Sequence, residues 1–563
     1  MTRSETIQRF RDNPRVPVLI VGAGINGAGL FRELALNGID ALLIDKSDIA
    51  AGASSAPSRM IHGGLRYLEN REVRLVKESL KERNLLLKNA PHYVKPLPTV
   101  IPIFQWFSGL LNAIPVFLGF KGKSVNRGGF LVKIGLSAYD FYTRKQRVMP
   151  THRFQDKKTA LQFRPALNPA IVCTAMYYDA WISYPERLCL ELCQDALASN
   201  AGSGLLNYCS LAGSNAETGE VYLKSELTGG TLTIRPDVVV NATGAWIDFT
   251  NASLQAKSTF IGGTKGSHLM INNAELMKAT QGQMLYYENS EGRICILFPL
   301  HGNVLVGSTD IKITNPEEAV CTDAEVAYML ESIRQVFPDI KIDPSEIVFR
   351  FSGVRPLPHS GADITAQISR DHSLPILPAT ERQKFPVYSM IGGKWTTFRA
   401  FASHTTEEIA KFLNLETKAS SEDEVIGGGR DFPAQPEERE KWIRERLRPA
   451  LSAGRLEQLL ERYGTNADHV ISYLLQPDNK PLRNHPQYST GEMQYLIENE
   501  FVEHLDDLVL RRTSLGLRGE LSRALLQELG EILMQSKPGL AGNPDGEIER
   551  TLGILNKKHG VNL

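Results

Sequence analysis

Residues 18–29 read Val-Leu-Ile-Val-Gly-Ala-Gly-Ile-Asn-Gly-Ala-Gly, an apolar run that passes directly into a glycine-rich turn. The spacing of Gly22, Gly24 and Gly27 is typical of a turn that joins a buried strand to a helix beside a bound dinucleotide. Gly22 permits the tight turn, Gly24 lets the backbone approach a pyrophosphate, and Gly27 lets the helix pack closely on the sheet. We therefore predict a dinucleotide at this helix N-terminus, where unpaired N–H groups carry partial positive charge.

A second apolar strand follows at residues 40–45 and ends in Asp45, eighteen residues after Gly27. A carboxylate at this place can accept hydrogen bonds from the ribose of the dinucleotide. Strand, glycine turn, helix and acidic residue thus occur in the order of a Rossmann unit and predict an α/β fold. The glycine turn by itself does not distinguish a nicotinamide cofactor from a flavin.

The bulk composition bounds the class of protein. With 563 residues the chain is too long for one ordinary core, and several domains are expected. Its 63 Lys and Arg residues equal its 63 Asp and Glu residues, so the net charge indicates no nucleic-acid partner. The six cysteines contain no Cys-x-x-Cys pair, no metal site is predicted, and no apolar signal segment precedes the first strand. These features predict a cytoplasmic protein.

The order of periodic segments suggests how the chain is divided. Residues 236–245 are typical of a buried strand that returns to the nucleotide sheet, followed by the small-residue turn at Thr243-Gly244. A polar linker at residues 417–423 precedes a mostly helical region. We therefore predict domains at 1–415 and 416–563. Helices are expected at 69–89, 441–451, 456–463, 493–508 and 521–535.

Residues 96–120 are the most apolar stretch and contain no charged side chain, while three basic residues follow before residue 128. Three prolines interrupt the stretch, so a single membrane-spanning helix is not expected. Aromatic and aliphatic side chains beside basic ones suit a segment in the headgroup region of a membrane. A buried hairpin or crossover accounts for the same composition, and the sequence leaves both open.

A more specific signature follows at residues 61–69, Ile-His-Gly-Gly-Leu-Arg-Tyr-Leu-Glu. With this string, the chain resembles the aerobic-type, FAD-dependent glycerol-3-phosphate dehydrogenases. The resemblance covers nearly the whole chain. It continues in Lys265-Gly266-Ser267-His268, Val306-Gly307-Ser308-Thr309-Asp310, Phe351-Ser352-Gly353-Val354-Arg355-Pro356-Leu357, Ser369-Arg370-Asp371, Gly392-Gly393-Lys394-Trp395-Thr396-Thr397-Phe398-Arg399 and Leu510-Arg511-Arg512-Thr513.

The resemblance implies a fold of the amino-acid-oxidase type. An FAD-binding Rossmann-type domain would be interleaved with a mixed β-sheet substrate domain, and a C-terminal helical domain would be appended. It also implies FAD as the cofactor. By resemblance, the FAD-binding residues are Gly22, Gly24, Asn26, Gly27, Asp45, Ser54, Ser55, His62, Gly63, Thr243, Gly244, Lys394, Trp395 and Thr396, with Ser54, Ser55 and Gly63 on the isoalloxazine side.

The implied reaction is oxidation of sn-glycerol 3-phosphate to dihydroxyacetone phosphate, with hydride transfer from C2 to the flavin N5. A phosphate monoester needs fixed cations, and the planar fork of arginine suits its oxygens. By resemblance, the substrate-binding residues are Arg66, Tyr67, Arg355, Arg370 and Lys394. His268 is the candidate catalytic base. Arg355 could instead stabilise the developing charge while water or another group removes the proton.

Two departures from the family pattern leave the substrate open. Ser183-Tyr184-Pro185 stands where the usual members carry paired aspartates, and the connection from Phe104 to Gly128 is longer than usual. A tetritol phosphate such as erythritol phosphate would use the same cations and flavin, in a pocket longer by one hydroxymethyl group. A non-catalytic flavin sensor would lack part of the residue set, which is complete here.

The electron acceptor is also left open. Quinone would suit a protein attached peripherally to the inner face of the cytoplasmic membrane, and the apolar stretch would give access to it. A soluble oxidase would use oxygen. The C-terminal helical region shows no chemistry of its own, so packing or contacts in a homodimer are its expected roles.

Overall fold

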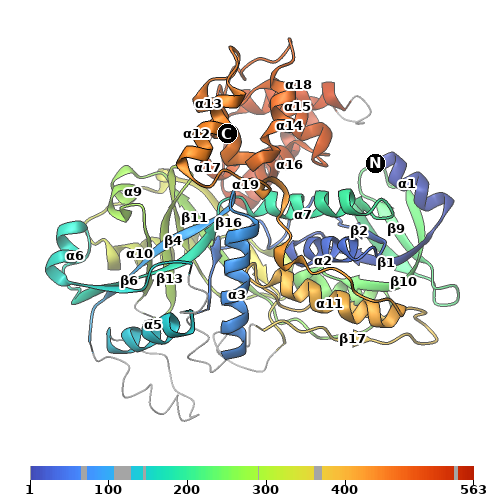
Figure 1. The fold of residues 1–563 in the computed structure, drawn as a ribbon, viewed down its shortest axis with the longest axis horizontal. Helices are drawn as coiled ribbons and strands as arrows, with labels where there is room; N and C mark the ends of the chain where they lie inside the picture. The colour runs from blue at the N-terminus through green and yellow to red at the C-terminus, as the bar shows by residue number, and fades with distance from the viewer. Residues whose placement is uncertain are drawn as a thin grey trace.

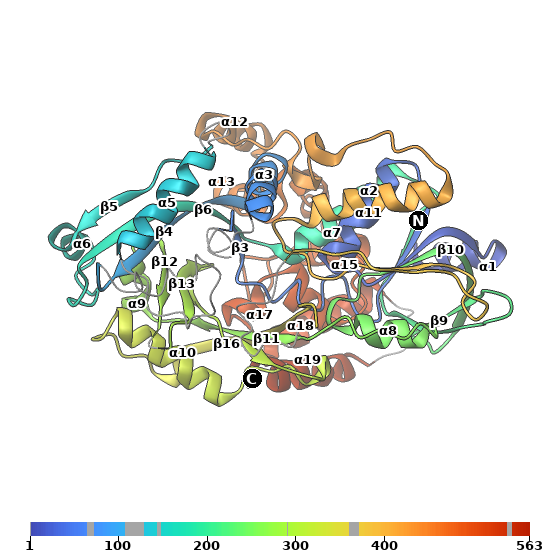
Figure 2. The same ribbon diagram turned by 90° about the horizontal axis from the view of Figure 1, so that it is seen from below.

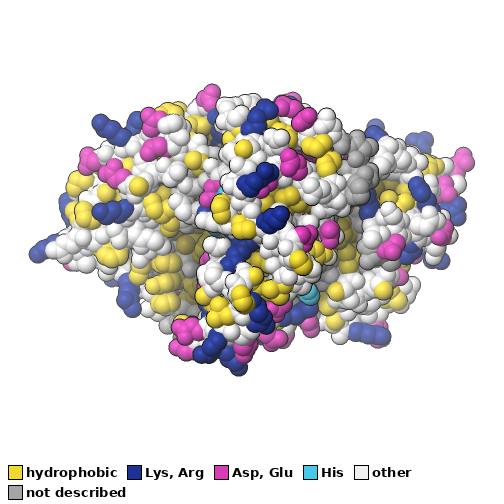
Figure 3. Space-filling view, turned by 90° about the horizontal axis from the view of Figure 1, so that it is seen from above, with side chains coloured by type: hydrophobic (Ala, Val, Ile, Leu, Met, Phe, Trp, Pro, Cys, Tyr) yellow, Lys and Arg dark blue, Asp and Glu magenta, His cyan; other side chains and the backbone are white. Residues whose placement is uncertain are grey.

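The computed structural model describes residues 2–64, 73–106, 129–143, 148–289, 291–359, 371–537 and 543–563. Two β-sheets lie side by side, and a helical domain formed by the C-terminal part of the chain covers them (Figure 1). On the outer face of this helical domain, Lys and Arg side chains are interspersed with Asp and Glu (Figure 3). The two sheets and the helical domain together are the arrangement that the resemblance predicted.

The first sheet is a parallel Rossmann sheet with an antiparallel extension. Its order is β17-β18-β10-β1-β2-β7, and β8 and β9 extend it from β10. The pairs β18-β10-β1-β2-β7 are parallel. Its strands are β1 (Arg15–Val21), β2 (Ala41–Ile44), β7 (Gly204–Leu206), β8 (Cys209–Ser214), β9 (Val221–Ser225), β10 (Thr231–Asn241), β17 (Ile376–Leu377) and β18 (Val387–Ser389).

Strand β1 is apolar because both of its faces are covered. Val18 and Ile20 pack in the cluster that includes helices α2 (Ile25–Leu36), α7 (Pro185–Ser199) and α11 (Phe398–Leu413). Leu19 and Val21 pack on the opposite side, against the layer of β8 and β9 and helix α1 (Arg3–Asp12). The predicted strand, glycine turn, helix and second strand are therefore confirmed.

The second sheet is mixed and mostly antiparallel. Its order is β15-β11-β14-β13-β12-β4-β6-β3, with β16 paired to β11 and β5 paired to β6. Its strands are β3 (Met60–Ile61), β4 (Val94–Ile103), β5 (Arg153–Asp156), β6 (Cys173–Ile182), β11 (Thr264–Ile271), β12 (Met284–Glu288), β13 (Ile294–Leu300), β14 (Asn303–Gly307), β15 (Ile311–Lys312) and β16 (Ile347–Arg355). Its helices are α3 (Val73–Asn89), α5 (Gly129–Thr143), α6 (Lys157–Phe163), α9 (Ala274–Thr280) and α10 (Asp323–Val336).

The chain passes repeatedly between the two sheets. It leaves the Rossmann sheet after β2, builds β3 to β6, and returns through α7 to β7. It leaves again after β10 and helix α8 (Ile247–Ser253), builds β11 to β16, and returns with β17 and β18. The interleaving implied by the resemblance is therefore confirmed.

The helical domain follows α11 and a polar segment. Its helices are α12 (Pro436–Arg446), α13 (Ala453–Tyr463), α14 (Ala467–Leu474), α15 (Thr490–Asn499), α16 (Leu505–Asp507), a π-helical turn (Leu508–Arg512), α17 (Leu515–Arg518), α18 (Arg523–Ser536) and α19 (Pro544–His559). The domain boundary at residue 415 stays a prediction.

Two predicted helices of this domain end early. The helix expected at 441–451 ends at Arg446, because Pro449 disfavours helical backbone in the residue before it. The helix expected at 493–508 ends at Asn499, and Phe501 takes a left-handed conformation with φ 55°. Glu500 then turns inward, where its carboxylate pairs with Arg187 at 2.8 Å. The expected helix at 69–89 is described from Val73 onwards.

A buried ion-pair network joins the helical domain to the Rossmann domain. Asp48, which follows β2, is inaccessible to solvent. Its carboxylate accepts hydrogen bonds from Arg511 Nε at 2.6 Å and from both terminal nitrogens of Arg512 at 2.7 and 2.8 Å. Arg511 also pairs with Asp506 at 2.9 Å. The Leu510-Arg511-Arg512-Thr513 motif thus anchors the two domains to each other.

The described part of the apolar stretch is mainly strand β4, whose whole length pairs with β6. Its residues 96–103 are therefore sheet and not a surface segment. Residues 107–120 lie outside the described residues. Among the helices that are described, none has the length together with the apolar character needed to cross a bilayer. All six cysteines are buried free thiols.

Candidate active site

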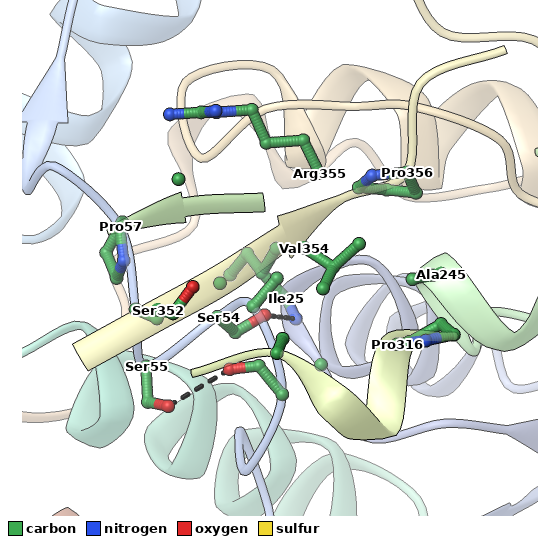
Figure 4. A pocket seen from close by; sticks show the side chains of 18 of the residues that line it. Ile25, Ser54, Ser55, Pro57, Ala245, Pro316, Ser352, Val354, Arg355 and Pro356 are labelled. Carbon is green, nitrogen blue, oxygen red and sulfur yellow. Dashed lines mark hydrogen bonds between the residues drawn. The ribbon is translucent and has the colours of Figure 1, made fainter. Parts of the chain in front are cut away.

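A large cavity lies where the two sheets and the helical domain meet. Its volume is about 1450 Å³, more than the 300–1,000 Å³ typical of a site for one small molecule. The glycine turn after β1 lines one end, and strands β11 and β16 of the second sheet line another part. Figure 4 shows Arg355 and Val354 on β16 close to the loop that carries Ser54 and Pro57. The cavity can therefore hold a large ligand and a small one together.

The glycine turn has the geometry predicted from its spacing. Gly22 has φ +107°, and a Cβ there would lie 2.7 Å from the carbonyl oxygen of Ala242 on the neighbouring strand connection. A Cβ on Gly27 would lie 1.8 Å from the carbonyl oxygen of Gly22, so only glycine lets α2 pack this closely. Gly22 and Gly24 line the cavity, whereas Gly27 acts behind it.

The Ser54 side chain lies beside the N-terminus of α2. Its Oγ accepts a hydrogen bond from the backbone N–H of Ile25 at 2.9 Å (Figure 4). A Cβ on Gly24 would lie 3.1 Å from the same Oγ. Ser54 therefore lies beside the helix N-terminus where the pyrophosphate is expected, and its place on the isoalloxazine side stays a prediction. Ser55 lines the cavity beside it.

Asp45 lies beside the same turn. Its two carboxylate oxygens accept hydrogen bonds from the backbone N–H groups of Ala23 at 2.7 Å and Ser47 at 2.8 Å. Burial raises the pKa of Asp45 to about 6, although these two N–H groups act in the opposite direction. The carboxyl group faces the cavity, at the place that the sequence predicts for a ribose contact.

The Gly392-Gly393-Lys394 motif contacts the start of α2 directly. The Asn26 side-chain amide donates a hydrogen bond to the carbonyl oxygen of Gly392 at 3.0 Å. Gly392 and Gly393 both have positive φ, at +73° and +81°. Thr396 Oγ1 donates to the carbonyl oxygen of His62 at 3.4 Å. The predicted residues His62, Thr243, Gly244, Lys394, Trp395 and Thr396 all line the cavity.

His268 on β11 is held by partners from two other segments. Its Nε2 lies 2.8 Å from Ser58 Oγ, and its ring stacks on Phe351, directly opposite on β16, with centroids 5.0 Å apart. A Cβ on Gly307 would lie 2.1 Å from the His268 ring, so glycine at that position makes room for it. The imidazole is buried and faces the cavity.

The residues of the Lys265-Gly266-Ser267-His268 motif point alternately to the two faces of β11. Lys265 pairs with Glu325 of α10 at 2.8 Å, and Ser267 Oγ donates to the same carboxylate at 2.8 Å. Gly266 and His268 face the cavity instead. Successive residues of a strand point to opposite faces, which explains this division. Lys265 is therefore part of the sheet's support and not of the cavity.

Arg355 ends strand β16 and projects into the cavity. Its guanidinium donates to Ser308 Oγ at 3.1 Å and to the carbonyl oxygen of Thr309 at 3.3 Å, and it pairs with Asp310 at 3.3 Å. A Cβ on Gly266 would lie 2.2 Å from its terminal nitrogen. The guanidinium therefore lies over Gly266. Gly266 belongs to the same strand as His268 and faces the same side of the sheet.

The electrostatics keep His268 neutral near pH 7. Burial, together with the positive charges of Arg355 and Arg59, lowers the pKa of His268 to about 3. An uncharged imidazole has one unprotonated nitrogen, which can receive a proton. The arrangement can thus bind an anion at Arg355 and accept a proton at His268.

Some predicted residues are not brought to the cavity or are not described. Arg66, Tyr67 and Arg370 lie outside the described residues. Gly63 does not line the cavity but lies directly behind its wall. The expectation that Ser183-Tyr184-Pro185 alters the substrate pocket is wrong. These residues begin α7, where Tyr184 packs against Tyr93 and His301, away from the cavity.

Sequence reasoning missed several side chains of the cavity wall. Ser58 follows the Ser54-Ser55 pair closely, and nothing in its sequence neighbourhood indicates a histidine partner. Arg59 takes a left-handed conformation at φ 55° and pairs with Glu186 at 3.2 Å. Asp179, which also lines the cavity, belongs to strand β6. Its position in a buried strand was the signal that could have found it, because an unpaired carboxylate is not tolerated there.

Comparison with known proteins agrees with this geometry. The sequence profile of the family described as FAD dependent oxidoreductase matches residues 17–392, which span both sheets. The chain belongs to the FAD-dependent oxidoreductase family. A second profile, described as the C-terminal domain of alpha-glycerophosphate oxidase, matches residues 419–537.

Relatives of this FAD-dependent oxidoreductase confirm the resemblance to glycerol-3-phosphate dehydrogenases. It is 29% identical to a glycerol-3-phosphate dehydrogenase of Synechocystis, over 90% of each chain. It is 29% identical to the aerobic glycerol-3-phosphate dehydrogenase of Escherichia coli, over 89% of this chain and 94% of that one. It is also 27% identical to D-erythritol 1-phosphate dehydrogenase of Brucella abortus, over 88% and 93%.

A solved structure shares the fold. The glycerol-3-phosphate dehydrogenase of Bacillus halodurans, complexed with FAD, superposes with a TM-score of 0.73 and 22% identity, covering 99% of this chain and 97% of that one. The predicted fold class is therefore confirmed for the whole oxidoreductase, including the helical domain.

FAD is the cofactor of this oxidoreductase, and the cavity fits it. Asn26 Oδ1 and Trp395 Nε1 are buried polar atoms that have no hydrogen-bond partner among the described residues, and both side chains line the cavity. Buried polar atoms in native proteins are nearly always satisfied, so a polar ligand is expected against them. The glycine turn, Asp45 and the Gly392-Gly393-Lys394 motif lie around the same space.

Proposed function

We propose that this oxidoreductase converts sn-glycerol 3-phosphate to dihydroxyacetone phosphate and passes the electrons to a quinone. One observation carries the proposal. Arg355, a candidate phosphate ligand, and His268, a candidate base, face the same cavity as the FAD-binding turn. The names of the relatives from Synechocystis and Escherichia coli support this substrate.

The substrate's charge assigns a role to Arg355. A phosphate monoester is nearly dianionic at pH 7, and a guanidinium fork binds two of its oxygens at once. Arg355 is pre-oriented by Ser308 and Asp310, so little side-chain entropy is lost on binding. Lys394 lines the same cavity and would add a second positive charge. Arg66, Tyr67 and Arg370 are proposed as further ligands on the resemblance alone.

The substrate's C2 hydroxyl assigns a role to His268. FAD, when bound, supplies the two-electron acceptor for the hydrogen on C2. The hydroxyl proton is received at Nε2 of His268, directly or through the Ser58 hydroxyl 2.8 Å away. A pKa near 3 makes this imidazole a weak base before substrate binds. Neutralisation of Arg355 by a phosphate would remove part of that lowering, so the base becomes stronger once the substrate is bound.

A second candidate substrate is a longer polyol phosphate. The relative from Brucella abortus is named for erythritol 1-phosphate and covers the chain to nearly the same extent. The phosphate-binding residues and the base would be the same for both substrates.

Anaerobic titration of the purified yellow protein distinguishes these substrates. Rapid bleaching of the visible flavin band by glycerol 3-phosphate is expected. Bleaching by erythritol phosphates alone would move the proposal to the longer substrate while retaining the same residues. Absence of bleaching by both compounds would reject a polyol phosphate dehydrogenase.

The proposed quinone acceptor requires access to a membrane surface. Trp106 at the end of β4, Phe130 and Ile134 of α5, and Val148 after it are exposed apolar side chains. The backbone N–H of Phe130 donates to the carbonyl oxygen of Trp106 at 3.1 Å, which joins the two segments. Between them the sequence has the apolar residues 107–120, followed by Lys121, Lys123 and Arg127. We propose that this surface docks on an anionic bilayer.

The acceptor is tested by comparing two oxidants. The reduced protein is expected to co-sediment with vesicles that contain anionic lipid, and to reduce a quinone analogue faster than oxygen. Stoichiometric peroxide formation without vesicle binding would instead support a soluble oxidase. We also propose that the membrane surface bound is the inner face of the cytoplasmic membrane. Residues 416–563 are proposed as a separate domain, and a homodimer is proposed to form through that domain.

A further inference from the structure

The segment 308–310, which joins β14 to β15, forms a bulge beside β11. The sheet register pairs His268 with Gly307 and Lys265 with Ile311, so two residues of β11 lie opposite three residues of this segment. A bulge interrupts the hydrogen bonds between strands and redirects the groups of the extra residue. The position of 308–310 therefore depends on other contacts.

Arg355 takes its position from this bulge. Its guanidinium donates to the carbonyl oxygen of Thr309 at 3.3 Å and to Ser308 Oγ at 3.1 Å, and it pairs with Asp310 at 3.3 Å. The carbonyl group of Thr309 is thus directed to the cavity side of the sheet. Because all three contacts come from the bulge, a shift of 308–310 would shift the guanidinium as well.

The side chain of Thr309 is held from behind the cavity wall. Thr309 is 3% exposed. Its hydroxyl donates to Glu325 Oε1 at 2.7 Å and accepts the backbone N–H of Ser267 at 2.9 Å. Glu325 belongs to the first turn of α10, which lies next to β11 and β16 in Figure 2. Thr309 therefore connects Glu325, outside the cavity, to Arg355 inside it.

The two carboxylate oxygens of Glu325 have different partners. Oε2 accepts the backbone N–H and the hydroxyl of Thr322, both at 2.9 Å, which caps α10, and it pairs with Lys265 at 2.8 Å. Oε1 accepts the hydroxyls of Ser267 at 2.8 Å and Thr309 at 2.7 Å. Burial acts to raise the pKa of Glu325, but these hydrogen bonds outweigh it and leave the pKa below its usual value. Helix capping requires only Oε2, so Oε1 has a separate role at the bulge.

We propose that Glu325 is a positioning residue for phosphate binding, because it holds Thr309 in the bulge and thereby holds the Arg355 guanidinium over Gly266. This inference rests on the proposed phosphate contact of Arg355. Glu325 itself does not line the cavity, so it acts through Thr309 and not on the substrate directly.

Glu325→Gln tests the proposal with an amide of the same shape. An uncharged acceptor forms weaker hydrogen bonds, so the KM for glycerol 3-phosphate is expected to rise about tenfold. The kcat should stay within about threefold, because Ser58 and Phe351 hold His268 separately. Steady-state kinetics with a quinone analogue measure the two constants, and visible absorbance measures the bound FAD, which should not change. A wild-type KM in this variant would overturn the proposal.

Thr309→Val and Thr322→Val form a matched pair, because each removes one hydroxyl from Glu325. Thr322 caps α10 and does not line the cavity, so Thr322→Val is expected to lower the unfolding midpoint and leave KM within about twofold. Thr309→Val should raise KM about threefold to tenfold. Thr309→Ser keeps the hydroxyl and should restore the wild-type KM. Equal KM values in the two valine variants overturn the proposal, also where Glu325→Gln does not fold.

A double variant separates this inference from the proposed phosphate contact. Arg355→Lys alone should raise KM, whether or not Thr309 positions the guanidinium. Adding Thr309→Val should then raise KM less than about twofold further, because the guanidinium that Thr309 holds is already absent. A fully additive increase would overturn the role of Glu325 while the phosphate contact stands. A wild-type KM in Arg355→Lys would reject the phosphate contact, and this inference with it. If wild-type flavin is bleached only by an erythritol phosphate, KM is measured with that compound.

Discussion

Ser58 Oγ and His268 Nε2 lie 2.8 Å apart, although the two residues belong to a loop and a strand separated by 210 positions. The loop follows the FAD-binding turn, and the strand belongs to the second sheet. This contact therefore ties the proposed proton acceptor to the segment that carries Ser54. This contact and the stacking of the ring on Phe351 together restrict rotation of the imidazole.

Substitution of His268 tests its role as the base. His268→Ala is expected to slow anaerobic flavin reduction by about 100-fold or more in single-turnover stopped flow. Ser58→Ala should slow it by up to about tenfold, because one hydrogen bond to the ring is lost. His301→Gln is the control, since His301 is partly buried and does not line the cavity. A wild-type rate in His268→Ala would eliminate His268 as the base.

The proposed phosphate contact is tested at Arg355. Arg355→Lys keeps the charge but loses the planar fork, so KM is expected to rise about 10- to 100-fold. Arg350→Lys is the control on the same strand, because Arg350 pairs with Asp323 at 2.6 Å outside the cavity. Steady-state kinetics with both variants measure the difference. Equal KM values in the two variants would contradict phosphate binding at Arg355.

The proposed membrane surface is tested on α5. Replacing Phe130 and Ile134 together by serine is expected to reduce co-sedimentation with anionic vesicles about tenfold or more, because two apolar side chains no longer enter the lipid boundary. Phe412→Ser on α11 removes an equally exposed phenylalanine elsewhere and should have no effect. Unchanged vesicle binding by the α5 variant would exclude this surface as the docking site.

The buried network between the domains should contribute to stability. Asp48→Asn leaves Arg511 and Arg512 without their shared anion, and loss of one partner from a buried ion pair costs about 3–5 kcal/mol of unfolding free energy. Glu549→Gln breaks an exposed pair with Arg523 and should cost less than about 1 kcal/mol. Urea denaturation of the FAD-loaded protein compares the two. Equal midpoints would show that the network does not stabilise domain docking.

Acid should destabilise the protein through histidines that the folded state holds neutral. Burial lowers the pKa of His301 to about 3, so the unfolded chain, with a pKa near 6.5, binds the proton more readily. The contribution of neutral His301 to the unfolding free energy is complete above pH 6.5. It is lost as the pH falls from 6.5 toward 3.

The loss below pH 6.5 amounts to about 1.4 kcal/mol per pH unit for this histidine. His301→Gln should therefore lose about 1 kcal/mol less unfolding free energy than the wild type between pH 7.5 and 5.5. Urea titrations at the two pH values measure this difference. An identical loss in both proteins would mean that His301 is not buried in its neutral form.

Local sequence patterns were sufficient for the Rossmann unit. The turn at Gly22, Gly24 and Gly27 depends on steric limits among neighbouring residues, and these limits are legible in the spacing itself. The cavity residues His268 and Arg355 were found through motifs. Their partner Ser58 was not, because a contact across 210 positions leaves no local pattern.

The error at Ser183-Tyr184-Pro185 has a similar cause. A changed residue type in a motif indicates that the surroundings of that residue differ from those in the family. It does not indicate whether the side chain points into the cavity or away from it. In the structure, Tyr184 packs against Tyr93 and His301, and Asp179, five positions earlier, lies at the cavity wall. Side-chain direction at the end of β6 decided the outcome, and composition does not reveal it.

The interleaved path through the two sheets has a consequence for synthesis on the ribosome. Strand β1 is complete at Val21, but its neighbour β10 ends at Asn241 and β18 ends at Ser389. At about 5–20 residues per second, the nascent chain waits about 20 to 70 seconds between the first and the last of these strands. The glycine turn is therefore synthesised early, and the strands that complete the FAD site beside it are synthesised late. We expect FAD to bind only when the chain is nearly complete, so a chain released prematurely should lack the yellow colour of bound flavin.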